Sequence, residues 1–349
     1  MELIKNFNTT NDLTDYEISM IKNVMNKYDI NINGIQKVRS VYKIETKEEL
    51  LCLKKMRHGK FKPINGSILV DELKKNNFKN VPNYIKTKDN KFFVKYKGLI
   101  FYLIQWIDGK ECKMKKLDEA VNCAKLLGKF HLATTKIDKS KLYIRDNSKN
   151  WDKIFIKYLN DLKNFKEFIG YKRFKDEFDE LYEENIDYFY TRGIFALNLL
   201  NKSSYYKSLN HENKTICHDS YYYQNIIKKD DEYYIVDLDS IVMNLKVYDL
   251  GKMINRLMYT NHYKWDFNKA KILIEAYNSV NQLSLEDLEI MLSLIVFPRK
   301  FWKLGKKRYV KTKNWDEDKY IHRLKKIIKF NKRQQKFIDL YKLYLYNFM

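Results

Sequence analysis

The chain has 349 residues, of which 45% are hydrophobic and 15% aromatic, with only 10 glycines and 3 prolines. This length exceeds the size at which a single core stops growing, so it predicts two lobes or domains, and the composition excludes a disordered or linker-rich chain. The 67 Lys and Arg against 44 Asp and Glu give a formal net charge of +23, which attracts anionic partners.

No apolar run is long enough to cross a bilayer, and the N-terminus lacks the charged-then-apolar layout of a signal peptide. We therefore expect no transmembrane segment and synthesis in the cytoplasm. Four cysteines have neither disulfide nor metal-ligand spacing and are predicted to be reduced thiols of the core: Cys52, Cys112, Cys123 and Cys217.

The N-terminal third has the partial alternation of apolar and polar residues that is typical of a half-buried antiparallel sheet. Strands are expected over residues 34–40, 41–46, 49–56, 81–85, 92–96 and 99–107, and a helix over 68–77. The segment DGKEC at 108–112 ends this pattern. Beyond it, apolar residues recur at helical spacing over 118–135, 150–169 and 172–200, and helices resume after residue 240, one with a capping box at Ser284 and Asp287.

This order of elements predicts an α+β fold of the protein kinase-like, two-lobed type. A small antiparallel-sheet lobe is expected over residues 1–107, and a larger, mainly helical lobe over 108–349 carries a catalytic-like loop at 217–240 and a basic C-terminal region. Within that region, residues 299–333 hold 15 Lys and Arg and 3 acids among apolar residues. They form either a surface that binds an anionic partner or a solvated helix face.

Residues 215–240, TICHDSYYYQNIIKKDDEYYIVDLDS, contain the spacing of a phosphoryl-transfer site. Kinase-like enzymes use a loop H-x-D-x-x-x-x-N, followed by a strand that ends in a metal-binding Asp. His218 and Asn225 have the loop spacing, and Asp237 stands at the end of the next predicted strand. Asn225 and Asp237 offer the oxygen ligands that Mg²⁺ prefers. The alternative is a β-hairpin loop whose polar side chains bond to the backbone.

The position of the catalytic base departs from this pattern. Ser220 stands five residues before Asn225, where the aspartate is needed, and Asp219 comes one residue early. A serine cannot act as a carboxylate base, and neighbouring side chains normally point in different directions. Asp219 and Ser220 are therefore the candidate catalytic positions of an impaired loop.

Nucleotide-binding candidates lie in the sheet lobe. Lys54 is on the third predicted strand, where a lysine can reach nucleotide phosphates. Gln105 and Ile107 lie where the chain leaves this lobe and are candidate contacts of an adenine. The turn at Arg39 and Ser40, which would cover the phosphates, has no glycine.

Several segments in order resemble a known superfamily. LIQWIDG, LGKFH, HDSYYYQN, IVDLDS and VYDLGK together are similar to the aminoglycoside phosphotransferases and choline kinases. Two longer strings, SKNWDKIFIKYLNDLKNFK and LIVFPRKFWKLGKKRYVKTKNW, resemble more narrowly the CotS-type spore coat proteins, and the likeness covers most of residues 35–330. The resemblance implies a kinase-like fold, ATP with Mg²⁺ as the cofactors to test, and synthesis in the mother cell followed by residence in the spore coat.

The resemblance also assigns roles to individual positions. His218 and Asn225 match the loop, Asp237 the metal-binding aspartate and Lys54 the strand lysine. Asp249 matches a structural aspartate that braces the loop together with His218.

Three functions follow from these observations. The favoured one is a spore coat protein that is structural or binds nucleotide weakly, a pseudokinase with other coat proteins or an anionic coat component as partners. The second is an active ATP-dependent small-molecule phosphotransferase, with Asp219 or Asp239 as its base. The third is a nucleic-acid binder, given the charge and the 28 tyrosines, although no recognition motif accompanies them.

Overall fold

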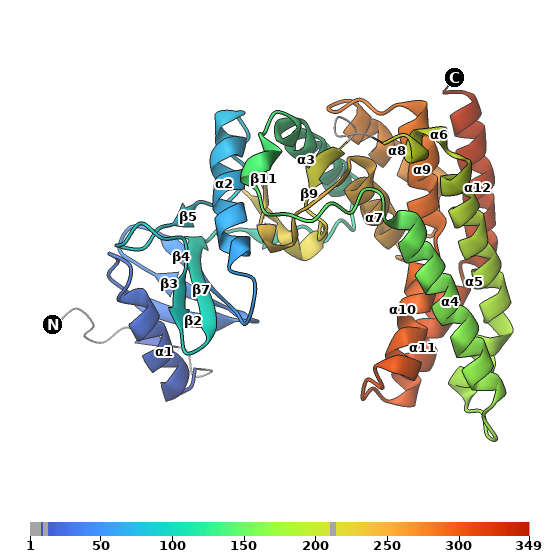
Figure 1. Ribbon diagram of the computed structural model, residues 1–349, viewed down its shortest axis with the longest axis horizontal. Coiled ribbons are helices and arrows are strands. Elements are labelled where there is room, and N and C mark those ends of the chain that lie inside the picture. Colours follow the sequence, from blue (N-terminus) through green and yellow to red (C-terminus); the bar gives the residue numbers. More distant parts are fainter. Residues whose placement is uncertain (1–7, 10–12, 210–213, 349) are drawn as a thin grey trace. The chain divides into compact units, whose positions relative to one another are not determined.

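The computed structural model describes residues 8–9, 13–209 and 214–348, and Figure 1 shows it as a ribbon. The chain forms two compact units. The sheet unit comprises Met1–Lys113, Leu132–Arg145 and Ser220–Ile241, and the helical unit comprises Met114–His131, Asp146–Asp219 and Val242–Met349. An antiparallel sheet in one unit and a mainly helical second unit confirm the predicted α+β class.

The main sheet of the sheet unit has the strand order β1-β2-β3-β4-β7-β5, with β6 on β7. Its strands are β1 (Asn8–Thr9), β2 (Gly34–Val38), β3 (Val41–Glu45), β4 (Leu50–Met56), β5 (Tyr84–Ile85), β6 (Val94–Tyr96) and β7 (Leu99–Gln105). The pair β1 and β2 is parallel, and the other neighbours are antiparallel. Each strand predicted for this region from the alternation is present, although several are shorter than expected.

Alternation along β4 separates the two faces of this sheet. Leu51 and Leu53 belong to a buried cluster that includes Ile21 and Val24 of helix α1 (Asp15–Met25), so α1 covers that face. Cys52 lies on the opposite face, together with Tyr102 and Ile104 of β7. Because side chains alternate, Lys54 shares the face of Cys52 and points away from the α1 core.

Helix α2 (Phe61–Lys75) begins earlier than the expected residue 68. Its first turns contain Pro63, Asn65 and Gly66, which are poor helix formers and hide the true start from a periodicity argument. Glycine is needed at Gly66, because a Cβ there would lie 2.1 Å from Tyr84 Oη. The helix can therefore pack closely against β5.

A second, three-stranded sheet belongs to the same unit and consists of β8 (Lys110–Glu111), β10 (Ile226–Lys229) and β11 (Glu232–Ile235). In this sheet β8 pairs with β10. The segment after β7 is thereby joined to the strand that follows Asn225. Gly109 makes this approach possible, since a Cβ at that position would lie 2.4 Å from the carbonyl oxygen of Lys228.

The helical unit contains long helices (Figure 1) and a short two-stranded antiparallel sheet. This sheet pairs β9 (Lys214–Cys217) with β12 (Val242–Leu245), which are far apart in the sequence. The helices, of which α3 runs on into the sheet unit, are α3 (Leu117–Thr135), α4 (Trp151–Gly170), α5 (Glu177–Lys202), α6 (Ser204–Lys207), α7 (Val247–Met258), α8 (Phe267–Asn278), α9 (Leu285–Val296), α10 (Arg299–Gly305), α11 (Glu317–Ile328) and α12 (Asn331–Tyr346).

Helices α4, α5, α7 and α9 pack on one another around an aromatic core. The rings of Phe155 and Phe297 are stacked with centroids 3.9 Å apart, and those of Tyr182 and Phe301 are stacked at 4.1 Å. Gly305 at the end of α10 leaves room for this core, because a Cβ there would lie 2.2 Å from Tyr182 Oη.

The helix starts and the cysteines of the chain were also predicted from the sequence. The capping box of Ser284 and Asp287 is present at the start of α9, and the four cysteines are free and buried, as expected. The helix predicted from residue 172 begins at Glu177, where Asp176 and Asp179 form a capping box. Among the described residues, no helix combines the length and the apolarity needed to cross a membrane.

Candidate functional site

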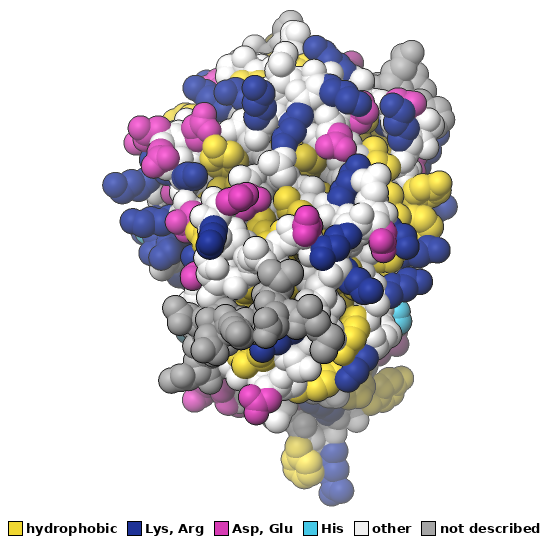
Figure 2. Space-filling view, turned by 90° about the vertical axis from the view of Figure 1, so that its left-hand side faces the viewer, with side chains coloured by type: hydrophobic (Ala, Val, Ile, Leu, Met, Phe, Trp, Pro, Cys, Tyr) yellow, Lys and Arg dark blue, Asp and Glu magenta, His cyan; other side chains and the backbone are white. Residues whose placement is uncertain are grey.

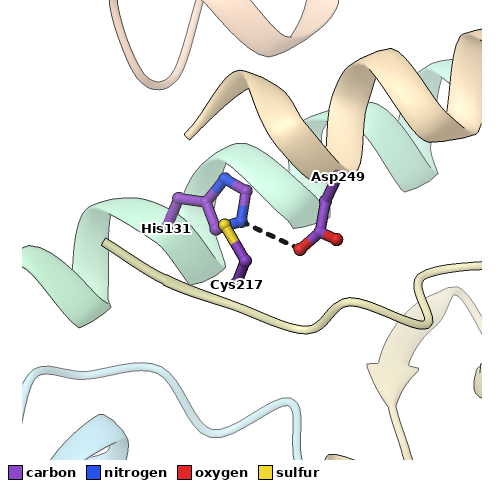
Figure 3. A group of neighbouring side chains, drawn as sticks. All are labelled: His131, Cys217 and Asp249. Carbon is purple, nitrogen blue, oxygen red and sulfur yellow. Dashed lines mark hydrogen bonds and ion pairs between the residues drawn. The ribbon is translucent and has the colours of Figure 1, made fainter. Parts of the chain in front are cut away.

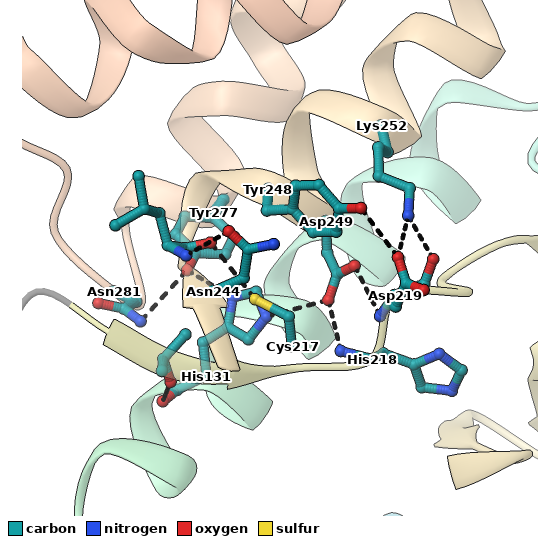
Figure 4. Close-up of polar contacts among 12 residues, drawn as sticks. His131, Cys217, His218, Asp219, Asn244, Tyr248, Asp249, Lys252, Tyr277 and Asn281 are labelled. Carbon is teal, nitrogen blue, oxygen red and sulfur yellow. Dashed lines mark hydrogen bonds and ion pairs between the residues drawn. The ribbon is translucent and has the colours of Figure 1, made fainter. Parts of the chain in front are cut away.

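The Asp249 carboxylate at the start of α7 organises the predicted loop within the helical unit (Figure 4). The backbone N–H groups of His218 and Asp219 donate to its two oxygens at 2.6 and 3.0 Å. The ring Nε2 of His131, on α3, lies 3.4 Å from the same carboxylate. Burial opposes ionisation of Asp249, but the hydrogen bond with His131 and the charge of Lys252 outweigh it and lower the pKa of the carboxyl. The carboxylate therefore fixes the backbone at the point where β9 ends.

His131, Cys217 and Asp249 lie close enough to be considered as metal ligands, with their potential ligand atoms within 4.8 Å of one another (Figure 3). Each is already engaged. The Cys217 thiol donates to the Leu245 carbonyl, and His131 Nδ1 lies 2.9 Å from the Tyr277 hydroxyl. Burial also raises the pKa of the Cys217 thiol well above its usual range, which disfavours the thiolate that binds metals. We interpret these three residues as a hydrogen-bonded group that stabilises the loop.

Asp219 is held by α7. Its Oδ1 accepts from the Tyr248 hydroxyl at 3.0 Å and from Lys252 Nζ at 2.6 Å, and Lys252 also donates to the Asp219 carbonyl. The backbone of Asp219 is left-handed, with φ of 61°. Burial lowers the pKa of Lys252 even beside this carboxylate. With two donors on Oδ1, Asp219 is committed to local contacts within the helical unit.

The sheet unit contains a separate cavity of about 640 Å³, in the range of small-molecule sites. Lys54 on β4 reaches into it and forms ion pairs with Asp237 and with Asp239 Oδ2, the latter at 2.8 Å. Burial favours the neutral amine, but the charges of Asp239 and Asp237 outweigh it and raise the pKa of Lys54. The Tyr102 hydroxyl also donates to Asp239.

Asn225, the last residue of the predicted loop, and Asp237, which follows β11, line the same cavity. Asn225 ends a short 3-10 turn, and its Nδ2 donates to the Ser220 carbonyl at 3.0 Å. The amide oxygen of Asn225 is therefore available as a cation ligand. Asp237 follows β11 and has a left-handed backbone with φ of 66°, a conformation that aspartate tolerates better than most residues.

The rim of this cavity is formed by the β2–β3 turn and by the segment after β7. Arg39 has a φ of 57° in that turn and forms an ion pair with Glu111 at 2.6 Å. Ser40 lines the cavity beside it, and Gln105 and Ile107 line it from the other segment. This turn has no glycine, but its arginine can supply a positive charge to a phosphate.

The structure divides the candidate residues between the two units. Lys54, Gln105, Ile107, Asn225 and Asp237 share the cavity of the sheet unit. His218, Asp219 and Asp249 lie together at the start of α7, whereas Ser220 is the first residue of the next segment of the sheet unit.

Sequence reasoning did not identify several partners of these residues. Asp239 had been considered only as a base, not as a partner of Lys54, and Tyr102 was not noted although it stands opposite Lys54 in the β4–β7 register. Lys252 and Tyr248 were also missed. A signal existed for Lys252, since it lies three residues beyond Asp249 and therefore on the same side of a helix.

Residues 21–341 match the family described as spore coat putative kinase YutH, which is most of the chain. The chain belongs to this family. Spore coat protein S of Bacillus subtilis (strain 168) is 25% identical over 246 residues, which cover 68% of this chain and 69% of that protein. Membership places the chain among spore coat proteins, as the CotS-type resemblance predicted.

Solved structures show the kinase-like fold. An aminoglycoside phosphotransferase from Alicyclobacillus acidocaldarius has a TM-score of 0.81 at 16% identity, covering 93% of this chain and 96% of its own. Spectinomycin phosphotransferase APH(9)-Ia, solved with ADP and spectinomycin, has a TM-score of 0.67 at 15% identity, covering 92% and 98%. The predicted two-lobed, aminoglycoside phosphotransferase-like fold is therefore confirmed.

Proposed function

We propose that this spore coat protein binds a nucleotide with a divalent cation in the cavity of the sheet unit, and binds it weakly. The observation that carries the proposal is the convergence of Lys54, Asn225 and Asp237 on one cavity of suitable volume. A lysine for the phosphates and two oxygen ligands for a cation are the parts that nucleotide sites of this fold need. The ADP bound to the spectinomycin phosphotransferase is consistent with this use of the fold.

The cation would be held by the Asp237 carboxylate and the Asn225 amide oxygen, with Lys54 on the phosphates. Bound Mg-ATP would supply a phosphoryl group activated for transfer. Two features weaken binding. The ion pairs of Lys54 with Asp237 and Asp239 must rearrange when Asp237 takes a cation, and the β2–β3 turn has Arg39 and Ser40 in place of glycines that would let the backbone approach a phosphate closely.

The test is a titration of the whole protein with Mg-ATP, followed by thermal shift and by calorimetry. We expect a dissociation constant weaker than about 100 μM, so the stabilisation at accessible concentrations is small. The variant is Asp237→Asn, which removes the charge and tolerates the left-handed backbone. It should abolish binding. The control Asp231→Ala removes an exposed carboxylate from the β10–β11 turn and should change nothing.

A tight complex that Asp237→Asn abolishes would favour the second candidate, an active small-molecule phosphotransferase. The observation in its favour is that the metal-binding half of the loop, Asn225 and Asp237, shares its cavity with Lys54. Against it stands Ser220 at the position of the base. For the coat role, we propose association with other coat proteins or with an anionic coat component, in line with the net charge of +23.

A further inference from the structure

The helical unit contains a cavity of about 240 Å³ that the proposed nucleotide site does not use. Helix α4, helix α7 and the segment from α9 to α10 form its walls. Five cationic side chains line it, and no carboxylate does: Lys252, Arg256, Arg299, Lys300 and Lys303.

The charge of this cavity is largely uncompensated. Lys252 is paired with Asp219, but Arg299, Lys300 and Lys303 form no ion pair with any residue in the described part of the chain. Burial, together with the charges of Lys326 and Arg256, lowers the pKa of Lys300 to about 7. Burial and the charge of Arg299 also lower the pKa of Lys303. The cations destabilise one another, and an anion placed among them would relieve that repulsion.

Part of the cavity lining is aromatic. Trp151 and Phe155 are buried, and the Trp151 indole N–H donates to the Asn244 side chain at 3.0 Å, which fixes its orientation. Phe155 stacks on Phe297, which also lines the cavity. An aromatic lining together with cationic side chains suits a compound with one apolar ring face and an anionic group.

The cavity adjoins Asp219. Tyr248 and Lys252 line it, and both donate to the Asp219 carboxylate (Figure 4). A ligand in the cavity would therefore lie beside Asp219, the acid that stands one residue before the expected position of the base.

We propose that this cavity binds a hydroxyl-bearing ring compound that carries a phosphate group, of the sugar phosphate class. The phosphate lies among Arg299, Lys300 and Lys303, whose guanidinium and ammonium groups bind phosphates well, and the ring lies against Trp151 and Phe155. Binding itself does not depend on the nucleotide site.

The test compares three hexoses that differ in charge: glucose 6-phosphate, glucose and glucosamine. Calorimetry with the whole protein, without nucleotide, should show binding of glucose 6-phosphate and none of the other two. The double variant Arg299→Gln, Lys303→Gln changes two exposed side chains and should weaken that binding by roughly tenfold or more. Lys163→Gln, an exposed charge of α4 outside the cavity, is the matched control and should bind like the parent protein.

A second measurement detects the uptake of a proton by Lys300 when the anion binds. At about pH 8 a phosphate monoester is already a dianion, since its second pKa is roughly 6. Anion binding raises the pKa of Lys300 from about 7, so the protein should take up a proton. Calorimetry in buffers of different ionisation enthalpy detects this uptake, and Lys300→Gln should remove it.

Two results would overturn the proposal: glucosamine or glucose binding as well as glucose 6-phosphate, or glucose 6-phosphate binding that the double variant leaves unchanged. Because these measurements contain no nucleotide, they are independent of the Mg-ATP titration with Asp237→Asn. A failure of either proposal can therefore be distinguished from a failure of the other.

Discussion

Asp219 and Asp237 both have left-handed backbone conformations, which are uncommon outside glycine and often mark functional positions. Asp237 uses this conformation at the end of β11 to reach Lys54. At Asp219 it accompanies contacts with Lys252 and Tyr248 instead. Asp219 and Asp237 thus serve different structural purposes, and Ser220 stands between Asp219 and the residues proposed to hold a cation.

We predict that Ser220→Asp increases phosphoryl transfer from Mg-ATP, measured against a panel of amino alcohols, sugars, sugar phosphates and peptide hydroxyls. A positioned proton acceptor typically contributes about 10²–10⁴-fold in rate, and Ser220 occupies the position from which that acceptor is missing. Asp219 is kept in this variant because the largely buried Lys252 depends on it for charge compensation.

A second variant, Ser220→Asp with Asp219→Gly, restores the usual order of the motif. Glycine suits the φ of 61° at position 219, but the change leaves Lys252 without its carboxylate, so we expect lower thermal stability than for Ser220→Asp alone. If the parent protein already transfers phosphate rapidly and Asp219→Asn abolishes the transfer, then Asp219 is itself the base and this interpretation of the loop is wrong.

Among the elements, α1 packs on the sheet through its apolar face, and one carboxylate adds a polar contact. Glu17 closes the capping box with Thr14, and its Oε1 accepts from Lys37 Nζ and from the Tyr42 hydroxyl, both at 2.8 Å. The hydrogen bond from Lys37 is the main cause that lowers the pKa of Glu17 to about 2, with burial opposing it and Tyr42 adding to it. The charged form of Glu17 therefore stabilises the folded state.

We predict that Glu17→Gln lowers the free energy of unfolding at pH 7 by about 1–2 kcal/mol, in the lower range for charged hydrogen bonds because Lys37 is partly exposed. Since the pKa is lower in the folded than in the unfolded state, this stabilisation is complete above the ordinary pKa of 4.5 and is lost as the pH falls towards 2. Denaturant unfolding of parent and variant should differ at pH 7 and converge near pH 2. The exposed control Glu48→Gln should behave like the parent at both pH values.

The elements also show how far local patterns predict this structure. Strands β2 to β4 follow from alternation because one face of each is buried by α1. The start of α2 does not, because Pro63 and Gly66 mask it and only the contact with Tyr84 explains the glycine. Asn225 and Asp237 could be singled out by their spacing in one short segment. The ion pair of Lys54 with Asp239 could not, because it joins residues 185 positions apart and depends on tertiary folding.

At the scale of the whole molecule, the excess of positive charge is widely distributed. Figure 2 shows Lys and Arg side chains scattered over one face, with carboxylates among them. The dense region 299–333 is largely built into the helical unit, where Phe301, Leu304 and Leu324 are buried. Part of its charge supports the fold, since Arg308 pairs with Asp176 and Glu317. Charge reversal at Arg308 would therefore disturb the fold as well as any binding to the coat.

A neighbouring basic cavity of about 550 Å³, which shares Lys300 and Lys303 with the cavity beside α4, is better suited to a test of coat association. Lys307, Arg323 and Lys326 line it and form no ion pair with a described residue. We predict that changing all three to Gln weakens retention on isolated coat material at low ionic strength. A rise in salt to a Debye length of about 8–10 Å screens exposed charges. It should therefore weaken the retention of the parent protein as well.

The control is a triple variant of equal charge, Lys47→Gln, Lys95→Gln and Lys163→Gln, at exposed positions away from that cavity. If overall charge alone drives retention, both triple variants lose it equally, because each lowers the net charge by three from +23. If the basic cavity is the contact, only the first variant loses it, while its thermal unfolding stays close to that of the parent. Unchanged retention of the first variant, with unchanged localisation in developing spores, would show that this cavity does not bind the coat.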